Sequence, residues 1–119
     1  MIEYLANLDA ENIIHRVKSA IIEHMHDGNI TVNKIAKKVF MSVRSLHRNL
    51  NGLGTSFGSI LDEVRRELAE HYVSDTREDL TEVAFRLGFS EQSSFSRAFK
   101  RWTGMSPSAY RADLEKQTL

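Results

Sequence analysis

The sequence predicts an all-α protein built from two helix–turn–helix subdomains joined by a long linker helix. Runs of alternating β-branched residues, which would indicate strands, are nearly absent from its 119 residues. Apolar residues recur instead at helical spacing in about seven segments. Residues 35–42, IAKKVFMS, also resemble residues 83–90, VAFRLGFS, at a shift of 48 residues. Such self-similarity indicates an internal repeat.

Length and composition narrow the possible functions. A chain of 119 residues holds one or two small domains. It has no cysteine, which excludes disulfides and thiolate metal sites and suits a reducing compartment. No apolar run approaches the roughly 20 residues of a membrane span, and the N-terminus lacks the basic start and apolar core of a signal peptide. We therefore expect a cytoplasmic protein.

Charge is distributed unevenly along the chain. Its 16 basic and 16 acidic residues give a net charge of zero, which by itself argues against binding to nucleic acid. However, residues 28–61 contain five basic and no acidic side chains, and residues 83–119 contain six basic and three acidic ones. Residues 62–82, between them, contain three basic and eight acidic side chains. Because charges act over a Debye length of about 8 Å, the two basic blocks could face a polyanion while the acidic block faces away.

The first subdomain is predicted over residues 9–54, after an N-terminal arm over residues 1–8. Asp9 can cap its first helix, because a side-chain oxygen at this position accepts from the free N–H groups of the first turn. Thr31 can cap the first helix of a helix–turn–helix unit, and Ser42 the second.

The second helix of this unit has an apolar face and an opposite polar face. The apolar face consists of Val43, Leu46 and Leu50 and the polar face of Arg44, Arg48 and Asn51, with His47 on the flank. In the turn before this helix, Phe40 stands where the repeat has Gly88. Positive φ, which glycine accepts, is costly for an aromatic residue. Either this turn has a different conformation or the first unit is strained.

A linker helix is predicted over residues 55–75, with Ser56 as its cap. A helix of about 17 residues spans roughly 25 Å. It could hold two recognition helices nearly one turn of duplex apart, about 34 Å, so that one chain reads two adjacent major grooves. If the separation falls short, bending the duplex toward the protein makes up the difference.

The second subdomain is predicted over residues 76–111, followed by a frayed C-terminal tail over residues 112–119. Thr81 can cap its first helix, Gly88 ends that helix, and Ser90 can cap the next one. This next helix has an apolar face opposite a polar face. The apolar face consists of Phe95, Ala98, Phe99 and Trp102, and the polar face of Ser93, Ser96, Arg97 and Lys100, with Gln92 and Arg101 at its edges. Ser106 and Pro107 begin a closing helix.

A helix with an apolar back and a polar front of Gln, Ser, Arg and Lys suits the DNA major groove. Arginine can pair bidentately with guanine and glutamine with adenine, while serine and lysine contact phosphates. Any amphipathic surface helix has a polar face, so the alternative is a helical protein-interaction module that does not bind DNA. The recurrence of the pattern in both repeats favours DNA.

The stretch LTEVAFRLGFSEQSSFSRAFKRWTGMSPSAYR, residues 80–111, resembles the second helix–turn–helix of the AraC/XylS family of bacterial transcription regulators. SFGSILDEVRRELAEHYV resembles the linker helix of that family, and residues 30–54 resemble its first unit. The resemblance implies a homeodomain-like fold with one recognition helix per major groove. It implies base contacts from Arg44, His47, Arg48, Gln92, Ser93 and Arg97, and phosphate contacts from Ser42, Ser90, Ser96, Lys100 and Arg101.

The resemblance also implies partners. The expected partner is double-stranded DNA, with RNA polymerase as a further one. Family members usually carry an effector-binding or dimerisation domain before this one, so we expect the DNA-binding part of a longer, nucleoid-associated regulator; a short single-domain member is the alternative. The acidic face of the linker helix, formed by Asp62, Glu63, Glu67 and Glu70, is either a solvated face or a surface for RNA polymerase.

No residue pattern indicates an enzyme. The five histidines lack the spacing of a metal-binding helix pair, since His24 and His26 lie two residues apart and point in different directions. Gly52 and Gly54 lack the remainder of a phosphate-binding loop. We therefore expect no catalytic residues, no cofactor and no metal.

Overall fold

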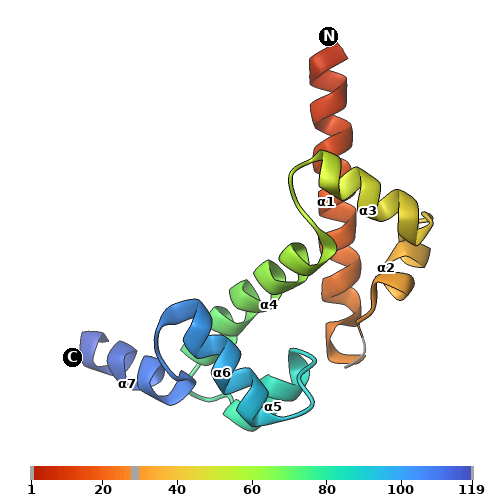
Figure 1. Cartoon of the computed structure of the whole chain (residues 1–119). Coiled ribbons are helices and arrows are strands. Elements are labelled where there is room, and N and C mark those ends of the chain that lie inside the picture. The colour runs from red at the N-terminus through yellow and green to blue at the C-terminus, as the bar shows by residue number, and fades with distance from the viewer. Residues whose placement is uncertain (1, 28–29, 119) are drawn as a thin grey trace. The chain divides into compact units, whose positions relative to one another are not determined.

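The computed structural model describes the backbone of residues 2–27 and 30–118, and the side chains of residues 13–25, 27 and 30–116. This part of the chain is helical and contains no strand, which confirms the predicted all-α class (Figure 1). The elements in chain order are α1 (Ile2–His24), the short 3-10 helix η1 (Met25–Asp27), α2 (Val32–Lys38), α3 (Val43–Gly52), α4 (Phe57–Ser74), α5 (Leu80–Arg86), α6 (Gln92–Thr103) and α7 (Pro107–Thr118). No helix in these ranges combines the length and the apolar character needed to cross a membrane.

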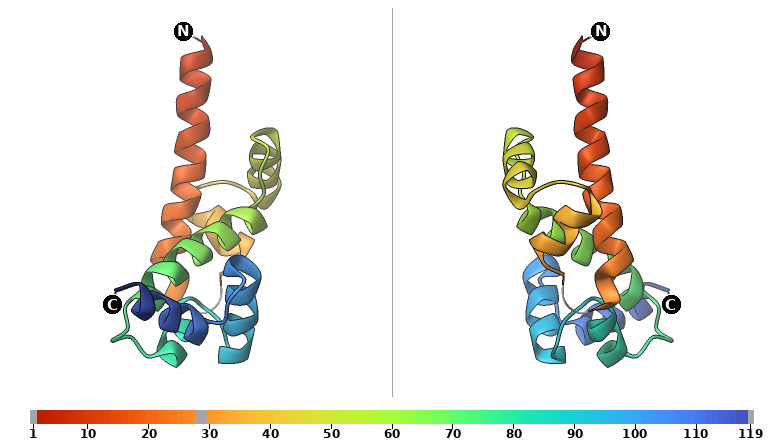
Figure 2. Two further views of the ribbon diagram at one scale, coloured as in Figure 1. Left: turned by 90° about the vertical axis from the view of Figure 1, so that its left-hand side faces the viewer. Right: turned by 90° about the vertical axis from the view of Figure 1, so that its right-hand side faces the viewer.

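The chain divides into two compact units. The first unit comprises Met1–His24 and Asn29–Val64, and the second comprises Met25–Gly28 and Arg65–Leu119. The predicted linker helix, α4, is continuous across the boundary between them (Figure 2). It therefore contributes its first half to one unit and its second half to the other.

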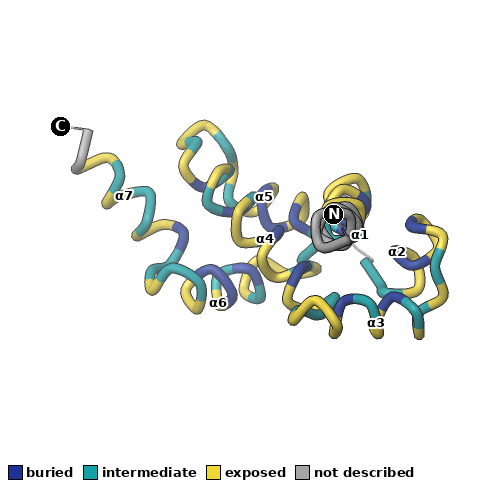
Figure 3. The backbone as a smooth tube through the Cα atoms, turned by 90° about the horizontal axis from the view of Figure 1, so that it is seen from above, coloured by how far each residue is buried: buried dark blue, intermediate teal, exposed yellow. Residues whose placement is uncertain are grey.

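The core of the first unit is aliphatic. In this unit α1 packs on α2, and α2 packs on α3. Figure 3 shows that buried residues recur along α3 with exposed ones between them, as expected for a helix with one apolar face. The buried side chains of this unit are Val17, Ala20, Ile21, Ile35, Ala36, Val39, Leu46, Leu50, Ile60 and Val64.

The core of the second unit, unlike that of the first, contains aromatic rings. The Phe95 and Phe99 rings, both fully buried, lie 5.8 Å apart, and the edge of Tyr110 meets Phe99 at 5.2 Å. Tilted and edge-on pairs of this kind add to the stabilisation from burial. Because Tyr110 lies on α7, the closing helix braces the back of α6. The buried cluster is Ala69, Val73, Val83, Ala84, Leu87, Phe95 and Phe99.

Arg111 also ties α7 to the loop between α4 and α5. Its guanidinium donates to the carbonyl oxygens of Val73 at 2.9 Å and Asp75 at 2.8 Å, and to that of Glu78. These carbonyls lie at the end of α4 and in the loop, where no helical partner is available. The planar guanidinium, with five donors, suits this task.

Four of the predicted caps are confirmed. In each case a hydroxyl oxygen accepts from the backbone N–H three residues later, which satisfies a donor of the first turn. The caps are Thr31 at 3.2 Å, Ser42 at 3.1 Å, Ser56 at 3.1 Å and Ser106 at 3.1 Å.

Both chain ends are more helical than predicted. The predicted cap at Asp9 is wrong, because α1 begins at Ile2 and continues through Asp9, so residues 2–8 of the predicted arm belong to this helix. No glycine or proline interrupts this stretch, so nothing ends the helix. For the same reason α7 runs to Thr118, so residues 112–118 of the predicted tail belong to this helix; residue 119 lies outside the described residues.

The cap of α5 is Asp79 rather than the predicted Thr81. The Asp79 carboxylate accepts from the Thr81 N–H at 2.8 Å. A carboxylate also interacts favourably with the positive end of the helix dipole. The helix therefore includes Leu80, which packs against the buried cluster of the second unit.

Candidate nucleic-acid interface

The turn of the second unit, between α5 and α6, depends on Gly88. Gly88 has a φ of +85°, and its N–H donates to the Phe85 carbonyl at 2.9 Å. The Phe89 N–H donates to the Ala84 carbonyl at 3.0 Å. This pair of bonds is a Schellman motif, which requires a left-handed residue after the helix. The predicted role of Gly88 is confirmed.

The turn of the first unit, between α2 and α3, has the same backbone with a phenylalanine in the left-handed position. Phe40 has a φ of +59°, and its N–H donates to the Lys37 carbonyl at 3.2 Å. The Met41 N–H donates to the Ala36 carbonyl at 2.9 Å. The left-handed conformation costs a non-glycine residue about 1–2 kcal/mol. The Phe40 side chain is 90% exposed, so little burial offsets this strain.

An arginine braces each turn from the preceding long helix. Arg16 of α1 donates to the Val39 carbonyl at 2.6 Å, and Arg65 of α4 donates to the Leu87 carbonyl at 3.2 Å. Val39 and Leu87 are the C-cap residues of α2 and α5, whose carbonyls have no partner within the helix. The Arg65 guanidinium also lies 4.9 Å from the centre of the Phe89 ring, within the range of a cation–π contact.

Sequence reasoning missed these two arginines. The signal that could have found them is their spacing, since Arg16 precedes Val39 by 23 residues and Arg65 precedes Leu87 by 22. This similar spacing extends the internal repeat to α1 and α4. Each unit is therefore a long helix followed by a helix–turn–helix.

The turn of the second unit is one residue longer than that of the first. Helix α3 begins at Val43, directly after its cap Ser42, whereas α6 begins at Gln92 with Glu91 at the cap position. The predicted cap at Ser90 is wrong, because the extra residue moves the helix start beyond it. Glu91 makes no side-chain capping hydrogen bond.

This extra residue changes the correspondence between the recognition helices. The buried pair Leu46 and Leu50 matches Phe95 and Phe99, which is a shift of 49 residues rather than 48. At this shift Arg48 corresponds to Arg97. Both arginines are exposed.

On α3, the three predicted base-contacting residues are brought together on the exposed surface. Arg44, His47 and Arg48 are all exposed, while Leu46 and Leu50 on the other face are fully buried. Within the described part of the chain, the side chains of these three residues form no hydrogen bond or ion pair. Their donors are therefore available to a ligand.

On α6, the predicted base-contacting residues Gln92, Ser93 and Arg97 are also exposed. Thr81 donates from its hydroxyl to Gln92 Oε1 at 2.8 Å. This bond between α5 and α6 occupies the amide oxygen of Gln92 and leaves its two N–H donors free of that contact. Ser93 donates to Glu91 at 3.3 Å, and Arg97 donates to Ser94 at 3.4 Å.

The predicted phosphate-contacting residues differ in accessibility. Ser42, Ser90, Lys100 and Arg101 are exposed, whereas Ser96 is half-buried. The Arg101 guanidinium lies 5.8 Å from the Trp102 ring centre. The Ser42 oxygen accepts from the Ser45 N–H, which leaves its hydroxyl proton to donate to a ligand.

The two helix–turn–helix segments differ in charge. Residues 31–55 contain five basic and no acidic side chains, whereas residues 79–103 contain four basic and three acidic ones. One of those four, Arg86, donates to Glu78 at 3.2 Å. This hydrogen bond, together with the negative charge of Glu78, raises the pKa of Arg86 above its usual value. The second segment therefore presents much less net positive charge than the first.

In the described part of the chain, no group of three or more His, Asp or Glu side chains is placed to hold a metal ion. On α4, Glu63 pairs with Lys18 at 3.2 Å and Glu70 with Arg66 at 3.3 Å. Exposed ion pairs of this kind are common on helix surfaces and contribute little to stability.

Comparisons with known proteins agree with this geometry. A family model described as a helix-turn-helix domain matches residues 35–113. The chain is 41% identical over 108 residues to the ornithine utilization regulator of Pseudomonas aeruginosa, an alignment that covers 90% of this chain and 32% of that protein. The chain thus spans about a third of the length of this relative.

Solved structures with the same fold include regulators of transcription. A DNA-binding transcriptional dual regulator from Escherichia coli K-12 superposes with a TM-score of 0.81 at 25% identity, over 87% of this chain and 93% of that one. The DNA-binding domain of AdpA, a global transcriptional factor solved in complex with a target DNA, superposes with a TM-score of 0.73 at 27% identity, over 87% and 94%.

Proposed function

The chain belongs to the AraC/XylS family of helix–turn–helix transcription regulators, and we propose that it reads double-stranded DNA with α3 and α6. The observation that carries this proposal is the duplicated unit. In both copies a braced turn of the same conformation presents a helix with a buried apolar face and an exposed face containing arginine. Such a helix fits the major groove, where base edges are distinguished by their donors and acceptors.

We propose that sequence is read by the exposed side chains opposite the two cores. Arg48 and Arg97, which occupy equivalent places on the two helices, are suited to bidentate contacts with guanine, and Gln92 to adenine. The free donors of Gln92 are the ones that the bond from Thr81 leaves available. The proposed base-contacting residues are Arg44, His47, Arg48, Gln92, Ser93 and Arg97.

Phosphate contacts are proposed to position the protein without reading sequence. Exposure supports this role for Ser42, Ser90, Lys100 and Arg101 more than for Ser96. We propose that the two recognition helices enter successive major grooves on one side of the duplex. The centres of the two short base sequences that they read would then lie about 10 base pairs apart.

The chain is proposed to act in the cytoplasm, at the nucleoid, as the DNA-binding part of a longer regulator. Its length, about a third of that of its relative from Pseudomonas aeruginosa, supports this proposal. We also propose that the longer regulator has an effector-binding or dimerisation domain and that it contacts RNA polymerase. The exposed carboxylates of α4, such as Asp62 and Glu67, are the candidate surface for the polymerase.

Selection of bound duplexes from a random pool, carried out at two salt concentrations, tests the proposed function. We expect two short enriched blocks about 10 base pairs apart, and an affinity that falls steeply with salt because phosphate contacts release counterions. Absence of enrichment, together with salt-insensitive binding or none, would instead indicate a protein-interaction module. A single enriched block would contradict reading by both helices.

A further inference from the structure

A shallow groove opens beside the turn of the first unit. It has a volume of about 440 Å³ and lies between α2 and the beginning of α3. The groove is lined by Asn33, Ala36, Lys37, Met41, Ser42 and Val43. Its polar side chains are an amide, an ammonium and a hydroxyl, all three exposed, and no carboxylate lines it. This set contains hydrogen-bond donors and a positive charge, which is the chemistry that an anion requires.

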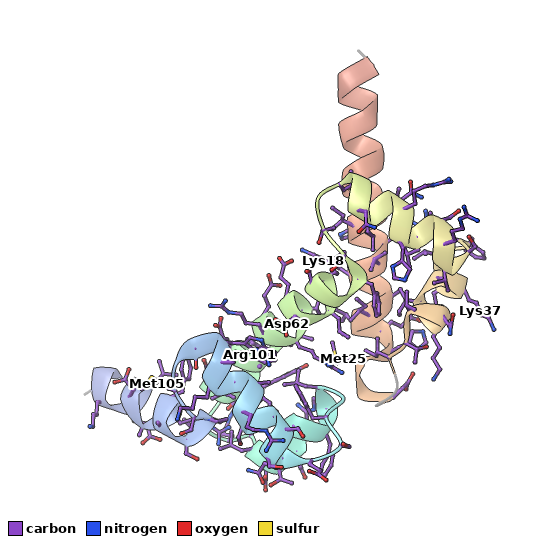
Figure 4. All side chains as sticks on the ribbon, viewed as in Figure 1. Lys18, Met25, Lys37, Asp62, Arg101 and Met105 are labelled. Atoms are coloured by element: carbon purple, nitrogen blue, oxygen red, sulfur yellow. The ribbon has the colours of Figure 1, made fainter. Side chains whose placement is uncertain are left out.

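Two neighbouring lysines of α2 lie on different sides of this helix. Lys37 lines the groove beside the recognition helix, whereas Lys38 lines a separate groove against α1. The second groove also contains the carboxylate of Glu23, so it is not uniformly favourable to an anion. Figure 4 shows the Lys37 side chain extending outward from α2. In the described part of the chain Lys37 has no ion-pair partner.

The corresponding positions of the second unit have different chemistry. At the shift of 48 residues that relates α2 to α5, Lys37 corresponds to Phe85. Beyond the turn, Glu91 occupies the cap position that Ser42 occupies in the first unit. Phe85 is 51% exposed, and Glu91 is also exposed. Thr81, the counterpart of Asn33, donates its hydroxyl proton to Gln92. The second unit therefore presents an aromatic ring and a carboxylate where the first presents an ammonium.

We propose that Lys37, assisted by Asn33 and Ser42, binds a phosphate diester of the DNA backbone in this groove, and that the second unit lacks the equivalent contact. This inference rests on the proposed function, because it requires that the chain bind DNA. It assigns a larger share of the sequence-independent affinity to the first unit. Lysine serves as a positive point charge for the phosphate, and the amide and hydroxyl supply neutral donors.

The test compares Lys37→Gln with Lys38→Gln. The two variants remove the same charge from adjacent exposed residues of one helix, so long-range electrostatics change almost equally. Affinity is measured over a range of salt concentrations for the selected duplex and for a random one. For Lys37→Gln we expect the slope of log affinity against log salt to become shallower by about 0.9, the value for one phosphate contact. Lys37→Gln should lose affinity for the selected and the random duplex by the same factor. Lys38→Gln should leave the slope unchanged.

Two results would overturn the inference. If the two variants reduce the slope equally, the effect of Lys37 comes from diffuse charge rather than from a contact. If neither variant changes it, Lys37 does not contact phosphate. Failure of the unmodified protein to bind any duplex is a separate result, which would contradict the proposed function itself. Circular dichroism and thermal unfolding of both variants confirm that the protein remains folded.

The converse variant tests the difference between the units. Phe85→Lys places an ammonium at the equivalent position of the second unit, and its aromatic ring is half exposed, so the core loses little. We expect the slope to steepen by about 0.9, with equal gains for the selected and random duplexes. An unchanged slope in a folded variant would overturn the inference that the ammonium accounts for the difference between the two units.

Discussion

The first helix–turn–helix unit forms its left-handed turn with an exposed phenylalanine, whereas the second forms the same turn with glycine. Local preference therefore does not decide this backbone. In both units a preceding arginine donates to the last carbonyl of the first helix, and a buried core fixes the helices on either side. Tertiary contacts impose the turn, and the residue at its centre determines only how much strain the turn contains.

The largest expected effects concern the two cores. Phe99→Ala should lower the free energy of unfolding by about 3–5 kcal/mol, because a buried ring with two aromatic neighbours is lost. Leu50→Ala, at the equivalent position of the first unit, should cost about 2–5 kcal/mol. Urea denaturation followed by circular dichroism measures both. A Phe99→Ala protein that is fully folded but no longer binds DNA would assign this ring to recognition instead of stability.

The recognition arginines should have matching effects on different bases. Arg48→Ala and Arg97→Ala should each weaken binding to the selected duplex by about 1–3 kcal/mol and relax one base position. We expect the two relaxed positions to fall in different enriched blocks. Lys100→Ala is the control, since loss of a phosphate contact should weaken binding to all sequences alike. If Arg97→Ala binds the selected duplex and the random duplex each as tightly as the parent protein does, Arg97 takes no part in base recognition.

The two bracing arginines should stabilise their units unequally. Arg65→Met should cost about 1–2 kcal/mol, because it leaves the Leu87 carbonyl without this donor and removes the cation–π contact with Phe89. Arg16 has no aromatic partner among the contacts described for it. Arg16→Met should therefore cost about 1 kcal/mol. Thermal and urea unfolding give both values. A larger loss for Arg16 would show that the aromatic contact does not strengthen the brace.

The smallest expected effect is a gain. Phe40→Gly should stabilise the protein by about 0.5–1 kcal/mol. The strain energy that is relieved in the left-handed conformation exceeds the conformational entropy that the more flexible glycine loses on folding. The exposed ring gives up little burial. Gly88→Ala, the matched change in the second unit, should destabilise by about 1 kcal/mol or more. If Phe40→Gly is destabilising instead, the ring makes a stabilising contact that compensates for its backbone.

Residue patterns predicted the helices and their buried faces well, because these follow from apolar periodicity. They placed some helix starts wrongly, as at Asp9 and Thr81, and they missed contacts that depend on distant parts of the chain. Arg16 and Arg65 resemble ordinary surface arginines until the fold brings them to a carbonyl more than twenty residues away. The cap at Ser90 failed because the repeat continues unchanged through the turn, so the extra residue before α6 is invisible until the two cores are compared.

The predicted site residues are arranged by the same periodicity, which is why the exposure of all of them except the half-buried Ser96 could be anticipated. The sequence could not indicate which of these residues form hydrogen bonds within the protein. The bond from Thr81 to Gln92 joins residues on different helices, and its presence depends on how α5 packs against α6. The different chemistry beside the two turns likewise becomes visible only when Lys37 and Phe85 are seen to occupy corresponding places.

The single helix α4 gives Ile60 and Val64 to one core and Ala69 and Val73 to the other. Backbone amides of one helix therefore report on two cores. If the units differ in stability, amide hydrogen exchange should change abruptly along α4 near Val64 and Arg65, because each half opens with the core that covers it. Strengthening only one core should slow exchange in its own half of the helix, which makes α4 an internal gauge of how far unfolding in one unit spreads to the other.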